Sequence, residues 1–361
     1  MELTIYDRFK VRTVKFFNEF DLSLNYDSFG STFSFKYLFN PENPDHKELS
    51  CVGHDHECVV THNGETLVTG FAMTQTYVHE PQGKMAVIQG YSKPGLFTDC
   101  QIPPDLYPLQ SDGVSLVTVT KRIIEPWKKW KIGLVVDPSV SDVANKAFKS
   151  VTASETENID SFLTNLAQQK SLIFSHDEHG NLLLTRAKTD EQPFMDFDRR
   201  VPQMIPLTGS EMSYSGQAMH SHIYVVKQAS SDGGNAGQYL IRNPYCPIVF
   251  RPKVVSQTSG DDIDTKEVAM RELAKELEEG LKFTIKTDRW TDAKGNIIKP
   301  NSIITIYDPE LYIYTKTRLF VRSIDFSGNQ SQTIATLNCV IPEAFNGKIP
   351  VSIFAGINMH P

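Results

Sequence analysis

Near the middle of the chain, the spacing of apolar residues predicts a helix followed by a hairpin. One helical face, with apolar residues at i, i+3, i+4 and i+7, is formed by Ile159, Phe162, Leu163 and Leu166. Ser154 and Glu157 have the spacing of a capping box at the start of this helix. After Lys170 the period changes, and two short strands are predicted at 171–175 and 182–186, joined by a polar turn.

This hairpin is expected to cover the apolar face of the helix with Leu172, Phe174 and Leu183. Its turn contains the run His176-Asp177-Glu178-His179, which offers an acid, a base and an imidazole together. Polar residues are the default at a hairpin tip, so we interpret the run as a turn and not as a catalytic site.

A period of two dominates the N-terminal region. Phe and Tyr alternate with other residues over 29–39, and Asn63-Gly64 is a strong turn signal between strands predicted at 59–61 and 65–72. A further strand is predicted at 85–90. Several short strands at near-regular spacing predict a β-barrel-type or sandwich domain over residues 1-90.

Residues 91-190 have mixed α/β character. The Pro-rich stretch 103–108 indicates a boundary. A helix ended by Pro126 is predicted from the residues that would share one face, Leu116, Val119, Ile123 and Trp127. A strand at 132–136 is followed by Asp137, placed to cap a second helix that begins at Pro138.

The last third returns to β structure. An acidic helix is predicted from Asp264, with Asp262 or Asp264 as its cap and an end near Gly280, inside a helical insertion at 260-281. The segment 230–237 is rich in Gly and Ser and predicts a mobile loop. Residues 213–228 are predicted to form a pair of strands or one long strand, and further strands are predicted at 283–286, 303–307, 311–315, 319–326 and 333–341. The predicted fold is therefore α+β and mostly β, with a second β-barrel-type domain over 191-345 and a C-terminal tail at 346-361.

Composition and charge argue against several classes of protein. A chain of 361 residues predicts two to four domains, and an apolar content of 40% is enough for real cores. The net charge of −7 argues against a general nucleic-acid binder. No apolar run reaches membrane-spanning length, and the N-terminal residues lack a signal-peptide pattern. Five scattered cysteines favour reduced thiols over a disulfide framework.

One cluster has residue types suited to zinc. Cys51, His54, His56 and Cys58 lie close together in the sequence, with His62 beyond them. Their spacing is not a standard ligand pattern, so we expect a polar loop between strands and no bound metal.

Other polar constellations have simpler interpretations. His220 and His222 are two apart on one face of a predicted strand, which would suit co-ligands, but a satisfied or solvated strand face is favoured. The acidic pairs 261–262 and 278–279 are interpreted as helix-end and solvated residues. Trp127 and Trp130 lie among lysines and could stack on nucleic acid or sugar, but packing at the core and its rim is favoured.

Sequence motifs of common enzymes are absent. No G-x-x-x-x-G-K, G-x-S-x-G or H-E-x-x-H pattern occurs. We therefore expect a non-enzymatic protein with no catalytic, cofactor-binding or metal-binding residues. A lytic enzyme would need two carboxylates, or a nucleophile with its base, in one cleft, and a glycan binder would need an exposed aromatic platform.

The order of several short segments resembles the baseplate hub protein of Mu-like contractile-tail phages. Residues 90–100 (GYSKPGLFTDC) resemble that family's Gly-x-Ser-x-x-x-x-Leu-x-Asp-Cys segment. Residues 171–186 resemble its hairpin, and 251–254, 299–301 and 308–309 match the layout of its last third. Strand 319–326 and segment 333–345 resemble its closing strands and Pro-x-Ala-Phe ending, whereas 347–361 has no counterpart.

This resemblance implies a structural hub in the virion tail baseplate, assembled in the host bacterial cytoplasm. It implies a homotrimer whose paired β-barrel domains form a ring of pseudo-sixfold symmetry between the tail tube and a central spike protein. DNA would meet the protein only in passage, and a negative interior would keep DNA from binding. Alternatives are a tail-associated glycan-binding or lytic protein, or the hub of a related contractile injection system.

Overall fold

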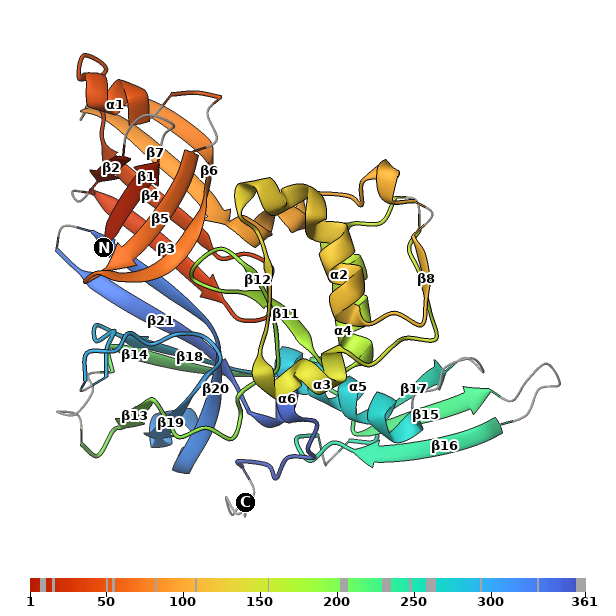
Figure 1. Cartoon of the computed structure of the whole chain (residues 1–361). Helices are drawn as coiled ribbons and strands as arrows, with labels where there is room; N and C mark the ends of the chain where they lie inside the picture. Colours follow the sequence, from red (N-terminus) through yellow and green to blue (C-terminus); the bar gives the residue numbers. More distant parts are fainter. Residues whose placement is uncertain are drawn as a thin grey trace. The chain divides into compact units, whose positions relative to one another are not determined.

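A computed structural model gives the fold of the chain (Figure 1). It describes residues 1–6, 11–14, 17–49, 51–53, 56–81, 83–107, 109–154, 156–201, 207–228, 235–246, 249–257, 264–292, 294–329 and 331–354. The chain forms two compact units: unit 1 contains Met1–Arg186 and Asp325–Thr333, and unit 2 contains Ala187–Ile324 and Ile334–Pro361. No helix within the described ranges has both the length and the apolar character needed to cross a membrane.

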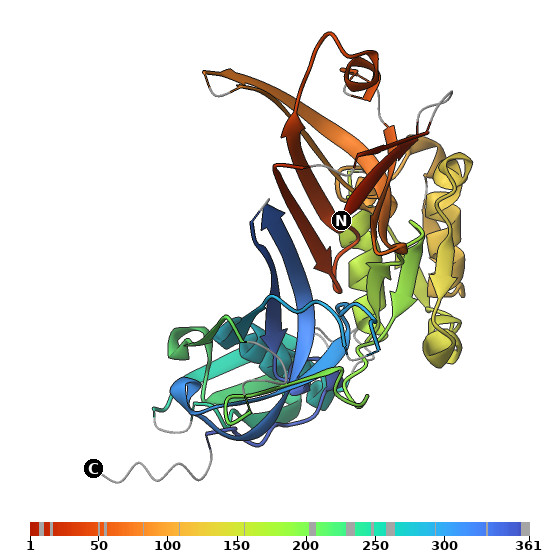
Figure 2. The ribbon, with the colours of Figure 1, turned by 90° about the vertical axis from the view of Figure 1, so that its left-hand side faces the viewer.

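Unit 1 begins with an antiparallel sheet in the order β2-β1-β5-β6-β7-β4-β3, and the end of β20 (Ile313–Asn329) lies beside β3. Figure 2 shows the hairpin of β6 and β7 extending as a long arm. A short helix, α1 (Pro44–Leu49), which the sequence analysis did not predict, follows β4. The strands are β1 (Glu2–Tyr6), β2 (Val11–Val14), β3 (Glu19–Asn25), β4 (Thr32–Leu38), β5 (His56–His62), β6 (Glu65–Glu80) and β7 (Gly83–Ser92).

The predicted turn between β5 and β6 is confirmed. Asn63 and Gly64 have φ values of 50° and 84°, the left-handed conformation that a tight hairpin turn requires and that these two residue types accept at low cost. The alternation of Phe33, Phe35 and Tyr37 along β4 is also confirmed, since all three are buried.

The second part of unit 1 is a small α/β cluster. Its helices are α2 (Leu116–Ile124), α3 (Ser141–Ala144) and α4 (Ile159–Gln169), and its main sheet has the order β11-β12-β9. The strands of the main sheet are β9 (Leu134–Val136), β11 (Ile173–His176) and β12 (Leu182–Thr185). A separate two-stranded sheet pairs β8 (Gln110–Asp112) with β10 (Ser150–Thr152). Short 3-10 helices are η1 (Lys93–Thr98), η2 (Pro104–Leu106), η3 (Glu125–Trp130) and η4 (Pro138–Val140).

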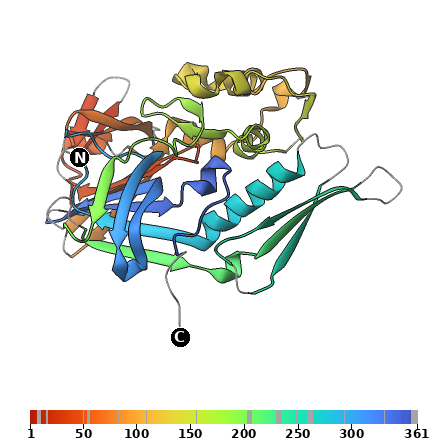
Figure 3. The same cartoon turned by 90° about the horizontal axis from the view of Figure 1, so that it is seen from below.

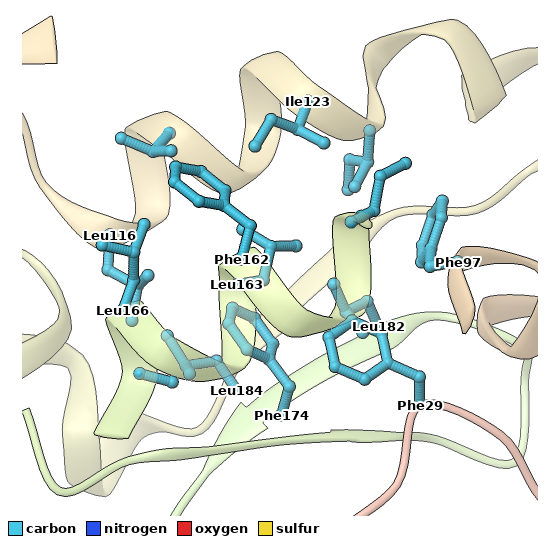
Figure 4. Packing of buried hydrophobic residues seen from close by; sticks show 14 of the residues in the cluster. Phe29, Phe97, Leu116, Ile123, Phe162, Leu163, Leu166, Phe174, Leu182 and Leu184 are labelled. Atoms are coloured by element: carbon cyan, nitrogen blue, oxygen red, sulfur yellow. The ribbon is translucent and has the colours of Figure 1, made fainter. Parts of the chain in front are cut away.

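The predicted helix-and-hairpin packing is confirmed, with one correction (Figure 4). Phe162 and Phe174 belong to one buried cluster, 3% exposed each. Leu183 does not face this cluster; it is half-buried, whereas its neighbours Leu182 and Leu184 are fully buried. The sequence analysis chose the wrong face of β12, because a run of three leucines does not show which two point inward.

The capping box at Ser154 is a second correction. Helix α4 starts at Ile159, with Asn158 as its N-cap. The Glu157 carboxylate instead accepts hydrogen bonds from the Ser154 backbone N–H and hydroxyl, at 3.0 Å and 3.1 Å. The two residues thus close a turn that precedes the helix. The predicted cap at Asp137 is confirmed, because its carboxylate accepts the Ser139 backbone N–H at 2.9 Å.

Unit 2 contains a mostly antiparallel sheet in the order β14-β18-β21-β20. Strand β19 also pairs with β20, and β13 pairs with β19 in parallel. Predicted strands 311–315 and 319–326 are one continuous strand, β20, and η6 (Pro309–Leu311) precedes it. The other strands are β13 (Met195–Asp198), β14 (Gly209–Tyr214), β18 (Leu281–Thr287), β19 (Ser302–Asp308) and β21 (Thr333–Val340).

A second layer of unit 2 packs α5 (Thr265–Gly280) on a three-stranded sheet in the order β16-β15-β17 (Figure 3). The acidic helix is confirmed, with Asp264 as its cap. Of the two alternatives for 213–228, the structure has two strands: β14 ends at Tyr214, β15 begins at His222, and η5 (Gly216–Ala218) lies between them. Of the loop predicted at 230–237, only residues 235–237 are described, in β16; residues 230–234 lie outside the described ranges. The strands are β15 (His222–Gln228), β16 (Asn235–Arg242) and β17 (Pro252–Gln257), and α6 (Glu343–Asn346) follows β21.

The fold class is confirmed as α+β and mostly β. Within the described ranges, however, the strand orders are open paths, and the sheets do not close into barrels. Alternating residues show that a strand is half-buried, but they do not show whether the first and last strands of a sheet pair. The finer division into 1-90, 91-190, 191-345 and 346-361 stays a prediction.

Candidate functional site: a polar groove on unit 1

The outer face of the first sheet is polar because its strands alternate strictly. Asp21 pairs in register with Ser34, and Ser34 pairs with Gln89. The residues beside them, such as Leu24 and Phe35, alternate with these positions and are buried. A row of small polar side chains therefore crosses three strands.

These side chains line a groove of about 460 Å³ on unit 1. A register shift in β6 between Ala72 and Thr74 bends that strand and sets Met73 on the groove wall, 39% exposed. The lining residues are Asp21, Leu22, Ser23, Thr32, Phe33, Ser34, Met73, Thr74, Gln89, Gly90, Tyr91, Asp325 and Phe326.

Gly90 at the groove floor is required by close packing. A Cβ atom there would lie 2.0 Å from the Phe71 carbonyl oxygen and 2.6 Å from the Phe33 ring. Ser92, two residues on, accepts the Ser31 backbone N–H at 3.0 Å in a fully buried site. The Gly-x-Ser part of the segment at 90–100 therefore fixes the end of β7 against β4 and β6.

The next residue of that segment, Lys93, is a buried cation. It is 2% exposed and forms an ion pair with Glu57 at 2.9 Å. Its Nζ also donates a hydrogen bond to the Trp130 carbonyl at 3.1 Å and lies 5.7 Å from the centre of the Phe71 ring. One side chain thus ties β5, β6 and the end of η3 together, which keeps the walls behind the groove in place.

The charges in the groove are negative. Burial raises the pKa of the Asp21 carboxyl, and the nearby charges of Glu19 and Asp325 raise that pKa further. Glu19 is paired with Lys36 at 3.2 Å. None of the described residues that line the groove is Lys, Arg, His or Cys. The groove can therefore repel a polyanion, but the described lining contains no histidine or cysteine for nucleophilic catalysis.

Asp21 and Asp325 carry no motif in the sequence that would mark them as site residues. They are far apart in the sequence and come together only because the end of β20 lies beside β3. The alternation over 19–24 (EFDLSL) predicts a half-buried strand with Glu19, Asp21 and Ser23 on its polar face, which was an available signal for the first carboxylate.

The cysteine and histidine cluster does not converge in the described residues. Cys58 is buried in β5, where its thiol donates to the His56 carbonyl, whereas Cys51 is exposed. His54 lies outside the described residues. Within the described ranges, no three His, Cys, Asp or Glu side chains are placed to hold a metal ion.

His220 and His222 do not share a strand face, because His220 precedes β15. The His220 ring bonds to Glu276 of α5 at 2.7 Å, and the Glu276 carboxylate, 3% exposed, also accepts the His220 backbone N–H at 2.8 Å. His222 points elsewhere, with its ring 5.1 Å from that of Phe250. The pair is therefore not a set of co-ligands.

The run at 176–179 is a structured turn, as interpreted. The Asp177 carboxylate accepts the backbone N–H groups of His179 and Asn181, at 3.0 Å and 2.7 Å. His176 faces the Ser28 carbonyl at 3.2 Å, and burial lowers the pKa of its imidazole. The Asp177 carboxylate therefore closes the turn, and the His176 ring faces backbone outside the hairpin.

The remaining candidates have packing or surface roles. Trp127 packs edge-on against Phe97 at 5.3 Å, and Trp130 is 43% exposed beneath the Lys129 ammonium, as expected for core and rim positions. Glu278 pairs with Arg322 at 2.6 Å and Glu279 is exposed. Asp261 and Asp262 lie outside the described residues.

Comparison with known proteins shows which solved structures have a similar fold. No family model matches the sequence, and no curated protein matches it either. The 43 kDa tail protein of prophage MuSo2 from Shewanella oneidensis superposes with a TM-score of 0.76 at 16% identity, covering 96% of this chain and 100% of that one. The tail protein from Neisseria meningitidis MC58 gives 0.77 at 16% identity, covering 96% and 98%.

An Escherichia coli component of the type VI secretion system, itself described as similar to T4 bacteriophage tail proteins, gives a TM-score of 0.57 at 9% identity, covering 98% of this chain and 80% of that one. The two tail proteins match almost from end to end, so the likeness includes both units. The resemblance indicated by the sequence motifs is confirmed at the level of fold: this chain has the fold of Mu-like prophage tail proteins.

Proposed function

We propose that the protein is the baseplate hub of a contractile phage tail. The observation that carries the proposal is the near-complete match to two tail proteins, one of them from a prophage, over 96% of this chain in both cases. The ordered motifs at 90–100, 171–186 and 319–326 support the same assignment independently of the structure. The hub is a homotrimer that joins the tail tube to a central spike protein, and it is assembled in the bacterial cytoplasm before it becomes part of the virion.

Open sheet edges support self-assembly. β2 is the outermost strand of the unit 1 sheet, and β14 is the outermost strand of its sheet in unit 2. An unpaired edge presents free backbone N–H and C=O groups, which another chain can satisfy. A ring of three chains would give these edges partners while keeping the assembly finite.

The polar groove suits the wall of a channel through which DNA passes. Small hydroxyl side chains give a smooth surface, and the carboxylates of Asp21 and Asp325 repel phosphates. In this role the groove binds nothing, and the protein has no catalytic activity. Replacing both carboxylates by lysine should create DNA binding at low salt, which fluorescence anisotropy with a short duplex measures; the wild type should not bind.

The decisive experiment is the native mass of the purified protein, by light scattering and native mass spectrometry, alone and with its spike protein. We expect a trimer. A monomer or dimer at every concentration, with and without the spike, contradicts the proposal.

A lytic or glycan-binding tail protein is the second candidate, because the groove holds two carboxylates beside Tyr91. Peptidoglycan hydrolysis that Asp325→Asn abolishes without loss of assembly would favour it. The hub of a related injection system is distinguished by finding which secretion or phage genes adjoin the coding sequence.

A further inference from the structure

The β16-β15-β17 sheet in unit 2 has one covered face. Ile223, Val225 and Ile241 point toward α5 and are buried. Lys253 of β17 lies on the same face and pairs with the α5 carboxylates of Glu272 and Glu276, at 2.9 Å and 3.2 Å. Helix α5 therefore covers this face of the sheet (Figure 3).

The opposite face, which we call the outer face, is apolar and open. The strand register places Leu240, Tyr224 and Val254 side by side across the three strands. Leu240 and Val254 are 39% and 66% exposed, and Phe250 at the end of the sheet is 67% exposed. Several exposed apolar side chains next to one another are typical of an interaction site.

The outer face is also basic. Arg242 lies opposite His222 in the register. Within the part of the chain that the structure describes, the Arg242 guanidinium has no ion-pair partner. None of the nine residues that the register places on this face, in 222–226, 238–242 and 252–256, is acidic. An occupant with aromatic and acidic groups would complement it.

The turn between β19 and β20, which we call the tyrosine tip, has that chemistry. Tyr312 and Tyr314 are 57% and 50% exposed, with their rings perpendicular at 6.2 Å. Glu310 is 78% exposed, and it shares the single guanidinium of Arg199 with the buried Asp308, which leaves one negative charge in excess. Exposed tyrosines are typical anchors of protein interfaces.

The backbone of the tyrosine tip has an unfavourable conformation at Tyr312. Tyr312 has φ 58° and ψ 23°, a left-handed conformation that costs energy for a bulky residue and none for glycine. Its side chain is mostly outside the fold, so internal packing does not explain why a tyrosine stands at this position.

We propose that the tyrosine tip of one copy docks on the outer face of a second copy, with Tyr312 and Tyr314 against Leu240 and Val254. Figures 1 and 3 place the two surfaces at opposite ends of unit 2, so the contact is head-to-tail and repeats from copy to copy until the ring closes. This inference rests on the proposed trimer and adds one contact between its copies to the pairing of the sheet edges.

The test is sedimentation equilibrium of the full chain over a concentration series. Arg242→Glu and Glu310→Arg each place like charges at the contact and should raise the dissociation constant at least tenfold, whereas the double charge swap should restore self-association. Glu125→Arg and Lys128→Glu, an exposed ion pair on η3 in unit 1, form the matched control and should leave self-association unchanged.

Tyr312→Gly separates an interface role from a structural one. Glycine suits the left-handed backbone, so the melting temperature should stay the same or rise while self-association weakens at least tenfold. A fall in melting temperature with unchanged assembly overturns the inference. A wild-type trimer whose charge-reversed variants assemble normally overturns this inference alone, and a wild-type monomer at every concentration overturns the proposed function as well.

Discussion

Replacing Phe162 by alanine tests whether the helix and hairpin of unit 1 are a structural core. The ring is 3% exposed and lies among residues of α2, α4 and β11 (Figure 4). A buried aromatic side chain removes roughly 150 Å² or more from water, worth about 4 kcal/mol at about 25 cal/mol per Å². The cavity adds to this loss and partial collapse of the site reduces it, so we expect a cost of about 3–5 kcal/mol.

Urea unfolding followed by tryptophan fluorescence measures this cost, because Trp127 packs against the same cluster. His179→Ala is the matched control at the exposed hairpin tip and should change the free energy of unfolding by less than about 0.5 kcal/mol. A tolerated Phe162→Ala, together with a His179→Ala protein that folds and assembles but lacks an activity, would reverse our preference for a scaffold over an enzyme.

Three further predictions concern unit 1. Lys93→Met should cost about 1–3 kcal/mol in urea unfolding, because the Trp130 carbonyl loses its donor while Glu57, 39% exposed, can still be hydrated; an unchanged midpoint would refute the role given to this cation. Under native conditions a thiol reagent at pH 8 should modify the exposed Cys51 within minutes and Cys58 only on unfolding, because burial raises the pKa of the Cys58 thiol to about 12; peptide mass mapping decides. Gly90→Ala should destabilise by about 3 kcal/mol through the clash at the groove floor, and a neutral effect would show that the strands there can separate freely.

Local patterns in the sequence predicted local structure well. The helices at 159–169 and 265–280 follow from their apolar spacing, and the turn at Asn63-Gly64 follows from the two residues that tolerate positive φ. Boundaries were less accurate, because the residues flanking α4 form a hydrogen-bonded turn that resembles a cap in sequence.

Long-range pairing was not predictable from these patterns. The groove needs Asp325 beside β3, a contact set by the path of β20 and not by any local signal. The open sheet edges could not be predicted for the same reason. Closure into a barrel depends on whether the first and last strands of a sheet pair, which is a long-range contact. The face of β12 that holds Leu182 and Leu184 was likewise decided by tertiary packing, which an unbroken run of leucines does not encode.

The division of unit 1 into two separated stretches of sequence has a consequence for synthesis of the chain. Unit 1 is complete only when Asp325–Thr333 has been added beside β3, about 140 residues after Arg186. At translation rates of about 5–20 residues per second, the first stretch of unit 1 remains without this partner for roughly 7–30 s after Arg186 has been added. During that interval the nascent sheet exposes an unpaired strand, so the ribosome-bound protein should depend on chaperones that shield β edges, and premature termination before residue 325 should yield aggregates and not a stable fragment.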